Sequence, residues 1–332
     1  MAARAGGRPH PAVAAVRYAV RSMLADLSPG DLVTVALSGG ADSLALADAV
    51  AFEAPRLRLR GGAVIVDHGL QEGSGAIASR AASTARDLGL DPVDVVSVAP
   101  GIGEPGGLEA AARAARYAAL AAVADRTGAA AVLLGHTLDD QAEQVLLGLV
   151  RGSGARSLAG MSPVRGGYRR PLLGITRQQT RDACTAEGLT WWDDPMNDDP
   201  RFTRVRARRA LADLERDLGP GLAAALARTA YRLRSDADHL DALADEALTA
   251  FPDGSVVPVD AMSRLPDAVR TRVWRRLLIA RGAPAGSLSS THIEACDALV
   301  TRWHGQGPVD VPGDVSVGRA ARLLRIESPA SG

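Results

Sequence analysis

Short apolar runs alternate with segments of helical periodicity through the first half of the chain. The apolar runs lie at 31–37, 62–67, 93–98 and 130–135, and the helical segments lie at 43–50, 76–88, 108–126 and 139–150. Continuous apolar strands that alternate with helices predict an α/β fold, with a parallel sheet covered by helices on both faces. Ligands of such sheets bind at the carboxyl ends of the strands, where Ser38, Asp67 and His136 follow three of the runs.

The pattern changes beyond Arg151, where glycines and arginines indicate a loop-rich connection. The elements expected after it are a long helix at 220–251, helices at 265–281 and 289–303, and a strand pair at 309–311 and 322–326. This change predicts two domains. The first covers residues 1–217, and the second, over 218–332, is a connector helix with a small, mainly helical domain.

Composition and charge exclude several classes of protein. The chain has 332 residues, of which 47% are hydrophobic and 23% charged, as is usual for a globular protein. Its 38 basic and 38 acidic residues balance, so the chain as a whole is no basic clamp for nucleic acid. All the basic residues are arginines, which excludes Walker-A NTPases, pyridoxal and Schiff-base enzymes, and ligases acylated on lysine.

The cysteines and the hydropathy indicate a cellular compartment. Cys184 and Cys296 form no CxxC motif, which argues against a disulfide framework, a zinc ribbon and a cysteine-ligated iron–sulfur cluster. We expect two buried thiols in a reducing compartment. No apolar run approaches the roughly 18–20 residues of a membrane span, so we expect a cytoplasmic protein with no membrane partner. The sequence does not decide the oligomeric state, and a homodimer is one of the possible states.

The string Ser38-Gly39-Gly40-Ala41-Asp42-Ser43 stands between a predicted strand and a predicted helix. Adjacent glycines allow a tight turn and a close approach of ligand to backbone, and the helix start offers N–H groups to an anion. The carboxylate of Asp42 is a candidate ligand for a magnesium ion. The structural alternative is a strand–turn–helix junction in which Asp42 or Ser43 caps the helix.

A second candidate site is the string GHTLDDQAE at 135–143, which places His136 just before a predicted helix. Asp140 and Glu143 are three positions apart, so their carboxylates converge on one helical face. Two carboxylates at one site require a cation between them, and a magnesium ion or an ammonium group would serve. The alternative is that acidic residues favour the first turn of any helix.

These strings are similar, in this order, to those of the tRNA(Ile)-lysidine synthase family. SGGxDS resembles the PP-loop of the ATP pyrophosphatase superfamily, which needs no Walker lysine. Further similar strings are VDHGL at 66–70, EAAARAARY at 109–117, RGSG at 151–154, LAGM at 158–161, RPLL at 170–173, WDDPMN at 192–197 and PRFTR at 200–204. The resemblance is dense over about residues 30–210 and loose elsewhere. Val205 departs from it, because the family commonly has asparagine there, and this puts the contribution of that asparagine in doubt.

The resemblance implies a ligase that uses ATP. Members adenylate the C2 carbonyl oxygen of the wobble cytidine in a CAU-anticodon isoleucine tRNA, and pyrophosphate leaves. The ε-amine of free lysine then attacks C2 and AMP departs, giving lysidine.

The resemblance also implies that residues 1–217 form the catalytic PP-loop domain and that the second domain, 218–332, assists tRNA binding. It further implies roles for residues at matching positions. Residues 38–43 would hold the ATP phosphates, with Asp42 touching Mg²⁺. Asp140 and Glu143 would bind the lysine substrate, and His136 would stabilise charge on the adenylate, unless it is a structural histidine beside the helix. Asp67 and His68 would lie near the adenosine.

Arginine placement indicates where tRNA binds. The segment RFTRVRARR at 201–209 has five arginines and no acid, and a local basic patch binds phosphate even when the net charge is zero. Arg204 and Arg208 match the family. The alternative is a solvated arginine-rich face. Trp191 and Trp192 nearby are expected to pack in the core rather than to stack on a flipped base.

A second basic group lies on the helix expected at 108–126. Arg113, Arg116 and Tyr117 share one helical face and offer two guanidinium forks and a stacking ring to tRNA. The alternative is that Glu109 pairs with Arg113.

Three other functions compete with lysidine synthesis. A tRNA thiolase of the same superfamily needs cysteines, often as CxxC, which this chain does not supply. An amidotransferase-coupled synthetase would have neither the HTLDDQAE string nor the arginine patch. A sensor that holds adenine nucleotide without cleaving it would have no use for two carboxylates beside an RNA patch.

Overall fold

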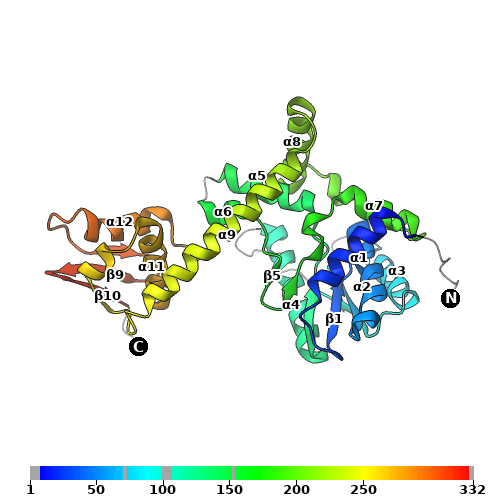
Figure 1. Cartoon of the computed structure of the whole chain (residues 1–332), viewed down its shortest axis with the longest axis horizontal. Helices are drawn as coiled ribbons and strands as arrows, with labels where there is room; N and C mark the ends of the chain where they lie inside the picture. Colours follow the sequence, from blue (N-terminus) through cyan, green and yellow to red (C-terminus); the bar gives the residue numbers. More distant parts are fainter. Residues whose placement is uncertain (1–7, 70–72, 99–106, 152–153, 329–332) are drawn as a thin grey trace. The chain divides into compact units, whose positions relative to one another are not determined.

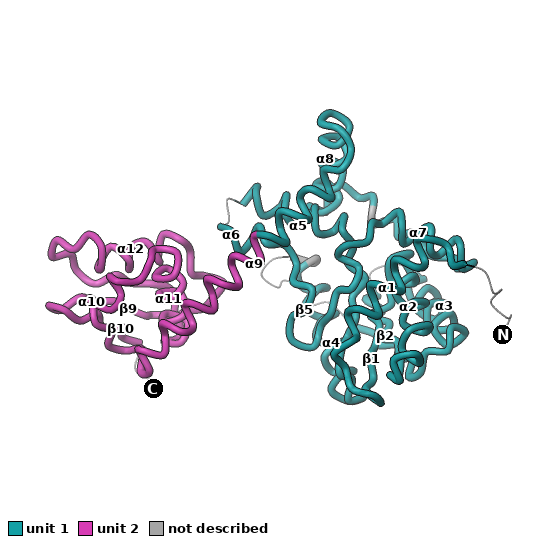
Figure 2. Tube along the Cα trace, viewed as in Figure 1, with its two compact units in different colours: residues 1–232 teal, residues 233–332 magenta. Residues whose placement is uncertain are grey.

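The computed structural model describes residues 8–69, 73–98, 107–151 and 154–328. The chain divides into two compact units, Met1–Arg232 and Leu233–Gly332 (Figure 2). The division falls inside helix α9 (Leu222–Leu248), whereas the sequence places the domain boundary at 217, before this helix.

A six-stranded sheet forms the centre of unit 1 (Figure 1). Its order is β3-β2-β1-β4-β6-β5, and every neighbouring pair is parallel except β5 with β6. The strands are β1 (Leu32–Ala36), β2 (Arg60–Asp67), β3 (Val93–Ser97), β4 (Ala129–Leu133), β5 (Val164–Arg165) and β6 (Tyr168–Arg169). The predicted α/β class is confirmed, and β1, β2 and β4 are adjacent, so the residues that follow them meet at one edge of the sheet.

Alternating side chains of these strands face two cores. Val33 and Ile65 belong to the larger core, which α1, α2, α3 and α7 complete, whereas Val64 and Val132 pack with Leu120 of α4. This alternation is why continuous apolar strands need helices on both faces. The helices of unit 1 are α1 (Pro11–Met23), α2 (Ala41–Glu53), α3 (Ser74–Asp87), α4 (Gly107–Thr127), α5 (Leu138–Val150), α6 (Ala155–Leu158), α7 (Arg177–Ala186) and α8 (Thr203–Leu218). Short 3₁₀ helices are η1 (Pro55–Leu57), η2 (Pro171–Gly174) and η3 (Pro195–Asp198).

Two helices that the sequence does not predict, α7 and α8, follow the loop-rich connection, whose glycines lie at 152–167. A capping box begins α7: Thr176 accepts from the N–H of Gln179, and the Gln179 side chain accepts from the N–H of Thr176. Helix α8 buries Val205 and Leu211 and ends at Leu218, with Gly219 as its C-cap. Local capping and amphipathic burial therefore stabilise these two helices.

Unit 2 combines helices with a four-stranded antiparallel sheet in the order β7-β10-β9-β8. Its strands are β7 (Val256–Pro258), β8 (Val309–Val311), β9 (Val315–Ala320) and β10 (Leu323–Glu327), and its helices besides α9 are α10 (Val259–Ser263), α11 (Asp267–Ala280) and α12 (Ser290–Thr301). The predicted pairing of 309–311 with 322–326 is wrong, because β9 lies between these strands and pairs with both. Val315 and Val317 of β9 are buried beside Trp274 in the core of this unit.

Both cysteines are buried thiols, as expected. Cys184 lies in unit 1 and Cys296 in unit 2, and burial raises the pKa of each thiol to about 12. Among the described residues, no helix is long and apolar enough to cross a membrane.

Candidate functional site

The loop of residues 38–43 joins β1 to α2 and leaves the start of that helix open. Gly39 has φ +85°, a left-handed conformation that favours glycine, and Gly40 is the N-cap of α2. The Ser43 hydroxyl donates to the Gly40 carbonyl oxygen (2.9 Å) and accepts from the Ser38 N–H (3.2 Å). Neither Asp42 nor Ser43 caps the helix, so the N–H groups of its first turn are available to an anion.

Distant segments hold this loop in place. The N–H of Trp192 donates to the Gly39 carbonyl oxygen at 3.0 Å. A Cβ atom at Gly135 would lie 3.2 Å from the backbone of Asp42 and Ser43, so a glycine there lets the end of β4 approach α2 closely. The residue after that glycine, His136, is thereby brought beside the loop.

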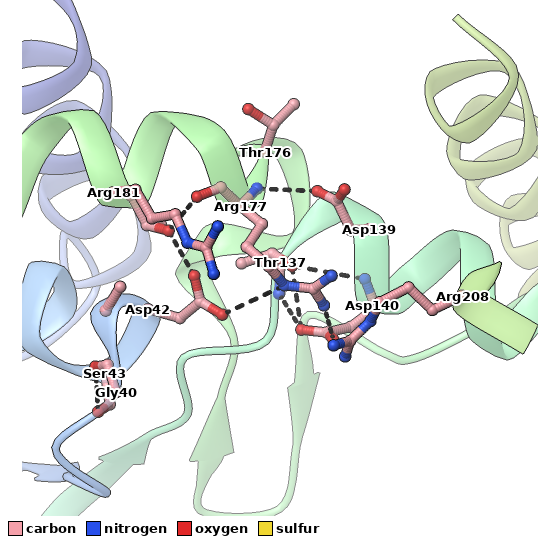
Figure 3. Close-up of polar contacts among 12 residues, drawn as sticks. Gly40, Asp42, Ser43, Thr137, Asp139, Asp140, Thr176, Arg177, Arg181 and Arg208 are labelled. Atoms are coloured by element: carbon pink, nitrogen blue, oxygen red, sulfur yellow. Dashed lines mark hydrogen bonds and ion pairs between the residues drawn. The ribbon is translucent and has the colours of Figure 1, made fainter. Parts of the chain in front are cut away.

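Three carboxylates meet around one guanidinium at this edge of the sheet (Figure 3). We call Asp42, Asp140 and Glu143 the carboxylate cluster. Arg177 Nη2 lies 2.8 Å from Asp140 Oδ1 and 3.3 Å from Glu143 Oε1. Arg177 Nε lies 3.8 Å from Asp42 Oδ2. The chain itself thus supplies the cation that the paired carboxylates require.

Asp140 has two roles, one for each oxygen. Its Oδ2 accepts hydrogen bonds from the N–H (2.8 Å) and the hydroxyl (3.0 Å) of Thr137, which closes the capping box of α5. Its Oδ1 accepts from Arg177. The two interpretations of this acid, a first-turn helix cap and a member of a cation site, therefore both apply.

Two further contacts complete the cluster. Arg208 Nε donates to Glu143 Oε1 at 2.9 Å, so this arginine of α8 faces the carboxylates. The Thr180 hydroxyl donates to Asp42 Oδ1, and α7 therefore holds the loop carboxylate with two of its residues.

The pKa values of Asp42 and Asp140 are shifted in opposite directions. Burial raises the pKa of Asp42 to about 6, and the neighbouring Asp140 adds to this, whereas Thr180 and Arg177 oppose it. Burial also acts to raise the pKa of Asp140, but Arg177 and Thr137 hold it below its usual value. Asp42 is thus the less compensated carboxylate, and an added cation there would favour its ionised form.

A magnesium ion suits Asp42 if the nucleotide supplies the remaining ligands. Among the described residues, no three His, Cys, Asp or Glu side chains are grouped so that they could hold a metal ion. Mg²⁺ is typically bound through one or two carboxylates together with substrate phosphates. Asp42 would supply the carboxylate ligand, and the open N-terminus of α2 would hold the phosphates that supply the others.

His136 is half-buried, and basic side chains act on its imidazole. Burial lowers the pKa of this imidazole to about 4; Asp140 opposes the shift, and Arg170, Arg204 and Arg113 add to it. Its Nδ1 is buried without a hydrogen-bond partner. The ring is therefore neutral near pH 7, and arginines from three different parts of the chain act on it.

The arginines of α4 meet the segment that follows β2. Arg116 Nε donates to His68 Nε2 at 3.3 Å. Arg113 Nη2 donates to the Tyr117 hydroxyl at 3.3 Å, and its guanidinium lies 4.9 Å from that ring's centroid. Asp67 Oδ1 accepts from the N–H of Gly69 and shapes its own loop. The side chain of Glu109 lies outside the described residues.

The five arginines at 201–209 do not form one uniform patch. Three of them bind nearby groups: Arg201 pairs with Asp199, Arg206 donates to the Pro200 carbonyl oxygen, and Arg209 donates to the Asp198 carbonyl oxygen. The other two, Arg204 and Arg208, act on His136 and Glu143 respectively. Trp191 packs against the core, as expected.

Sequence reasoning missed Arg177, Thr180 and Arg170. The first two lie on α7, whose start has a recognisable signal: Thr176 followed three positions later by Gln179. Arg170 belongs to the RPLL string, but its burial and its influence on His136 follow only from the packing of η2.

Comparison with known proteins gives two family matches. Residues 14–215 match the model of the PP-loop domain, and residues 258–325 match the model of the TilS substrate binding domain. The tRNA(Ile)-lysidine synthase of Thermobifida fusca is 56% identical over 92% of this chain and 94% of its own length. That of Streptomyces coelicolor is 51% identical over 96% of this chain and 99% of its own.

A solved structure shares the fold. The U34-tRNA thiolase NcsA from Methanococcus maripaludis, determined with its [4Fe-4S] cluster, aligns with a TM-score of 0.56. The alignment covers 67% of this chain and 79% of that one at 19% identity. At this identity the likeness concerns the fold alone.

Proposed function

The chain belongs to the tRNA(Ile)-lysidine synthase family, and on this premise we propose how its site makes lysidine. The enzyme is a ligase that forms a carbon–nitrogen bond, binds ATP through its PP-loop domain and acts on tRNA(Ile). The finer assignments, namely lysine, magnesium and individual residues, are our proposals.

The proposed reaction has two steps. The C2 carbonyl oxygen of the wobble cytidine in the CAU anticodon attacks the α-phosphorus of ATP, and pyrophosphate leaves. The ε-amine of free lysine then attacks C2, the C2–O bond breaks, and AMP departs with that oxygen while the amine loses a proton. The new base pairs with A instead of G, which changes the codon from AUG to AUA.

The loop of residues 38–43 would bind the phosphates of ATP. Its glycines expose backbone N–H groups, and Ser38 and Ser43 add hydroxyl groups. Asp42 would hold Mg²⁺, which supplies positive charge to the phosphates. Asp67 and His68, at the end of the neighbouring strand, would lie near the adenosine.

Asp140 and Glu143 would bind the ammonium group of lysine. The observation that carries this assignment is that both carboxylates already contact a single nitrogen, Arg177 Nη2, at 2.8 and 3.3 Å. Their geometry therefore suits one donor nitrogen that bridges the two acids. Charge-assisted hydrogen bonds of this kind are about twice as strong as neutral ones.

His136 would act as a neutral group in this site. Because burial keeps its pKa near 4, the imidazole stabilises the adenylate by hydrogen bonding and not by a full charge. Arg113, Arg116, Arg204 and Arg208 would supply the positive charge that tRNA phosphates need, with Arg208 also contacting Glu143.

The competing functions are not favoured. A thiolase that carries an iron–sulfur cluster needs several thiolate ligands, and the two cysteines of this chain are buried in different units. A nucleotide sensor would not require the TilS substrate binding domain that residues 258–325 match. We place the enzyme in the cytoplasm, and a homodimer stays a prediction that light scattering would decide.

The test is incorporation of radiolabelled lysine, with ATP, into a transcript of CAU-anticodon tRNA(Ile). A CAU-anticodon tRNA(Met) transcript is the matched control. Label on the isoleucine transcript alone is expected. AMP release without label on either transcript would mean that another nucleophile is used, and the absence of AMP would contradict ligase chemistry.

A further inference from the structure

Arg177 connects two parts of the site that bind different substrates. Its Nε lies near Asp42 of the nucleotide loop, and its Nη2 bridges Asp140 and Glu143, the carboxylates assigned to lysine (Figure 3). One guanidinium therefore responds to charge at both places. The proposed function assigns no role to this residue.

Hydrogen bonds fix the backbone of Arg177, so the starting point of its side chain is fixed as well. Its N–H donates to Asp139 Oδ2 at 2.8 Å. Helix α7 is in turn attached to α2 through Cys184, whose thiol donates to the Ala41 carbonyl oxygen at 3.3 Å. The side chain that extends from this backbone is 19% exposed.

An incoming lysine ammonium competes with this guanidinium. Both oxygens of Asp140 already accept hydrogen bonds, Oδ2 from Thr137 and Oδ1 from Arg177. An ammonium that binds Oδ1 would therefore share this oxygen with Nη2, and the two positive charges would repel each other. Glu143 Oε1 likewise accepts from both Arg177 and Arg208.

Nucleotide binding changes this competition. The triphosphate at the loop of residues 38–43 carries more negative charge than one bound Mg²⁺ neutralises, so it attracts the guanidinium toward Asp42 and away from Asp140 and Glu143. This attraction weakens the contacts that block the lysine carboxylates. The side chain is thus placed to transmit nucleotide binding to the lysine site.

We propose that Arg177 is a positioning residue that makes lysine binding depend on bound nucleotide. The inference rests on the proposed function, since it takes lysine as the amine and residues 38–43 as the phosphate loop. Without nucleotide, the Arg177 guanidinium pairs with Asp140 and Glu143. With nucleotide bound, it moves away from them, and the lysine ammonium binds in its place. By linkage, lysine strengthens nucleotide binding by the same factor.

The experiment measures the dissociation constant of lysine by calorimetry with and without Mg²⁺ and α,β-methylene ATP, which resists cleavage at the bond that the reaction breaks. For the unmodified protein we expect the nucleotide to tighten lysine binding within the usual range for coupled sites, about 5- to 150-fold. For Arg177→Gln we expect a ratio close to one. Arg177→Lys, a point charge without the fork, should give an intermediate ratio.

Arg181→Gln is the matched control. Arg181 lies one turn further along α7, is 46% exposed and pairs with Asp193 at 3.5 Å, outside the carboxylate cluster. This variant should keep the ratio of the unmodified protein. An unchanged ratio in Arg177→Gln would overturn the proposal.

A second variant and a prior activity measurement distinguish the possible causes of a negative result. If Arg177→Gln does not fold, as judged by thermal melting, Arg177→Lys decides: a reduced ratio supports the proposal and an unchanged one overturns it. Lysine incorporation into tRNA(Ile) by the unmodified protein is measured first. Its absence would contradict the proposed function, whereas incorporation with an unchanged ratio in the Arg177 variants contradicts only the linkage.

Discussion

Replacing Asp140 by asparagine removes one charge from the lysine site and keeps the size of the side chain. The carboxylate accepts from Thr137 through Oδ2 and from Arg177 through Oδ1. An amide has one acceptor oxygen and one NH₂ group, and both neighbours are donors. Asparagine therefore satisfies either the helix cap or the guanidinium, but not both.

The size of the effect follows from the contact that is lost. A hydrogen bond to a charged group contributes about 1.5–3 kcal/mol, and the bound lysine ammonium would lose one such contact at Asp140 Oδ1. Because 1.4 kcal/mol corresponds to a tenfold change, we expect the KM for lysine to rise by about 10- to 150-fold. The KM for ATP should change little, since the loop of residues 38–43 is untouched.

The assay is AMP formation with saturating tRNA(Ile) at varied lysine, then at varied ATP. Asp193→Asn is the control, because that carboxylate is 74% exposed and pairs with Arg181 outside the cluster. Thermal melting of both variants accounts for a weakened capping box in α5. An unchanged KM for lysine in Asp140→Asn would refute the assignment of this carboxylate to the amine.

Further predictions concern the pH dependence of stability, the salt dependence of tRNA binding, the KM for lysine and the reactivity of the thiols. As the pH falls from about 6.5 to about 4, the unfolded chain protonates His136 but the folded chain does not, so His136 alone should lower the free energy of unfolding by up to about 3 kcal/mol, whereas Asp42 acts in the opposite direction; the difference between urea titrations of the unmodified protein and of His136→Gln isolates this contribution, and no difference would contradict it. Arg204→Gln should reduce the slope of log affinity for tRNA against log salt by about one, and a filter-binding slope equal to that of the unmodified protein would contradict a phosphate contact. Arg208→Gln should lower the KM for lysine, since it removes a cation that competes with the ammonium for Glu143 Oε1, and an effect on tRNA alone would argue against that competition. Neither Cys184 nor Cys296 should react with a disulfide reagent at pH 8 until urea unfolds the chain; rapid labelling of either thiol beforehand would contradict its burial.

Local patterns in the sequence were sufficient for much of the fold and for part of the site. The apolar runs identified β1 to β4; in β1, β2 and β4 the reason is that strands covered on both faces are buried along most of their length, whereas β3 lies at the edge of the sheet. The spacing of Asp140 and Glu143 placed both acids on one face of α5, since helical geometry brings positions three apart together. The SGGADS string placed the phosphate loop at the carboxyl end of β1.

Other features needed the tertiary structure. Helix α7 was not predicted, although its capping box of Thr176 and Gln179 is visible in the sequence. In unit 2, β9 was missed because Gly318 and Arg319 interrupt its apolar alternation, which holds only at Val315 and Val317.

The sequence by itself identified the residues to which we assign the chemistry, and the tertiary structure decided their partners. Arg177 lies 37 positions after Asp140 and 34 after Glu143, and Arg208 lies 65 after Glu143, so no local spacing connects them. Their meeting depends on how α7 and α8 pack beside the sheet. The charge state of His136 likewise depends on burial and on arginines from distant segments. Interactions along one helix follow from its geometry, whereas contacts between elements exist only once the whole core is packed.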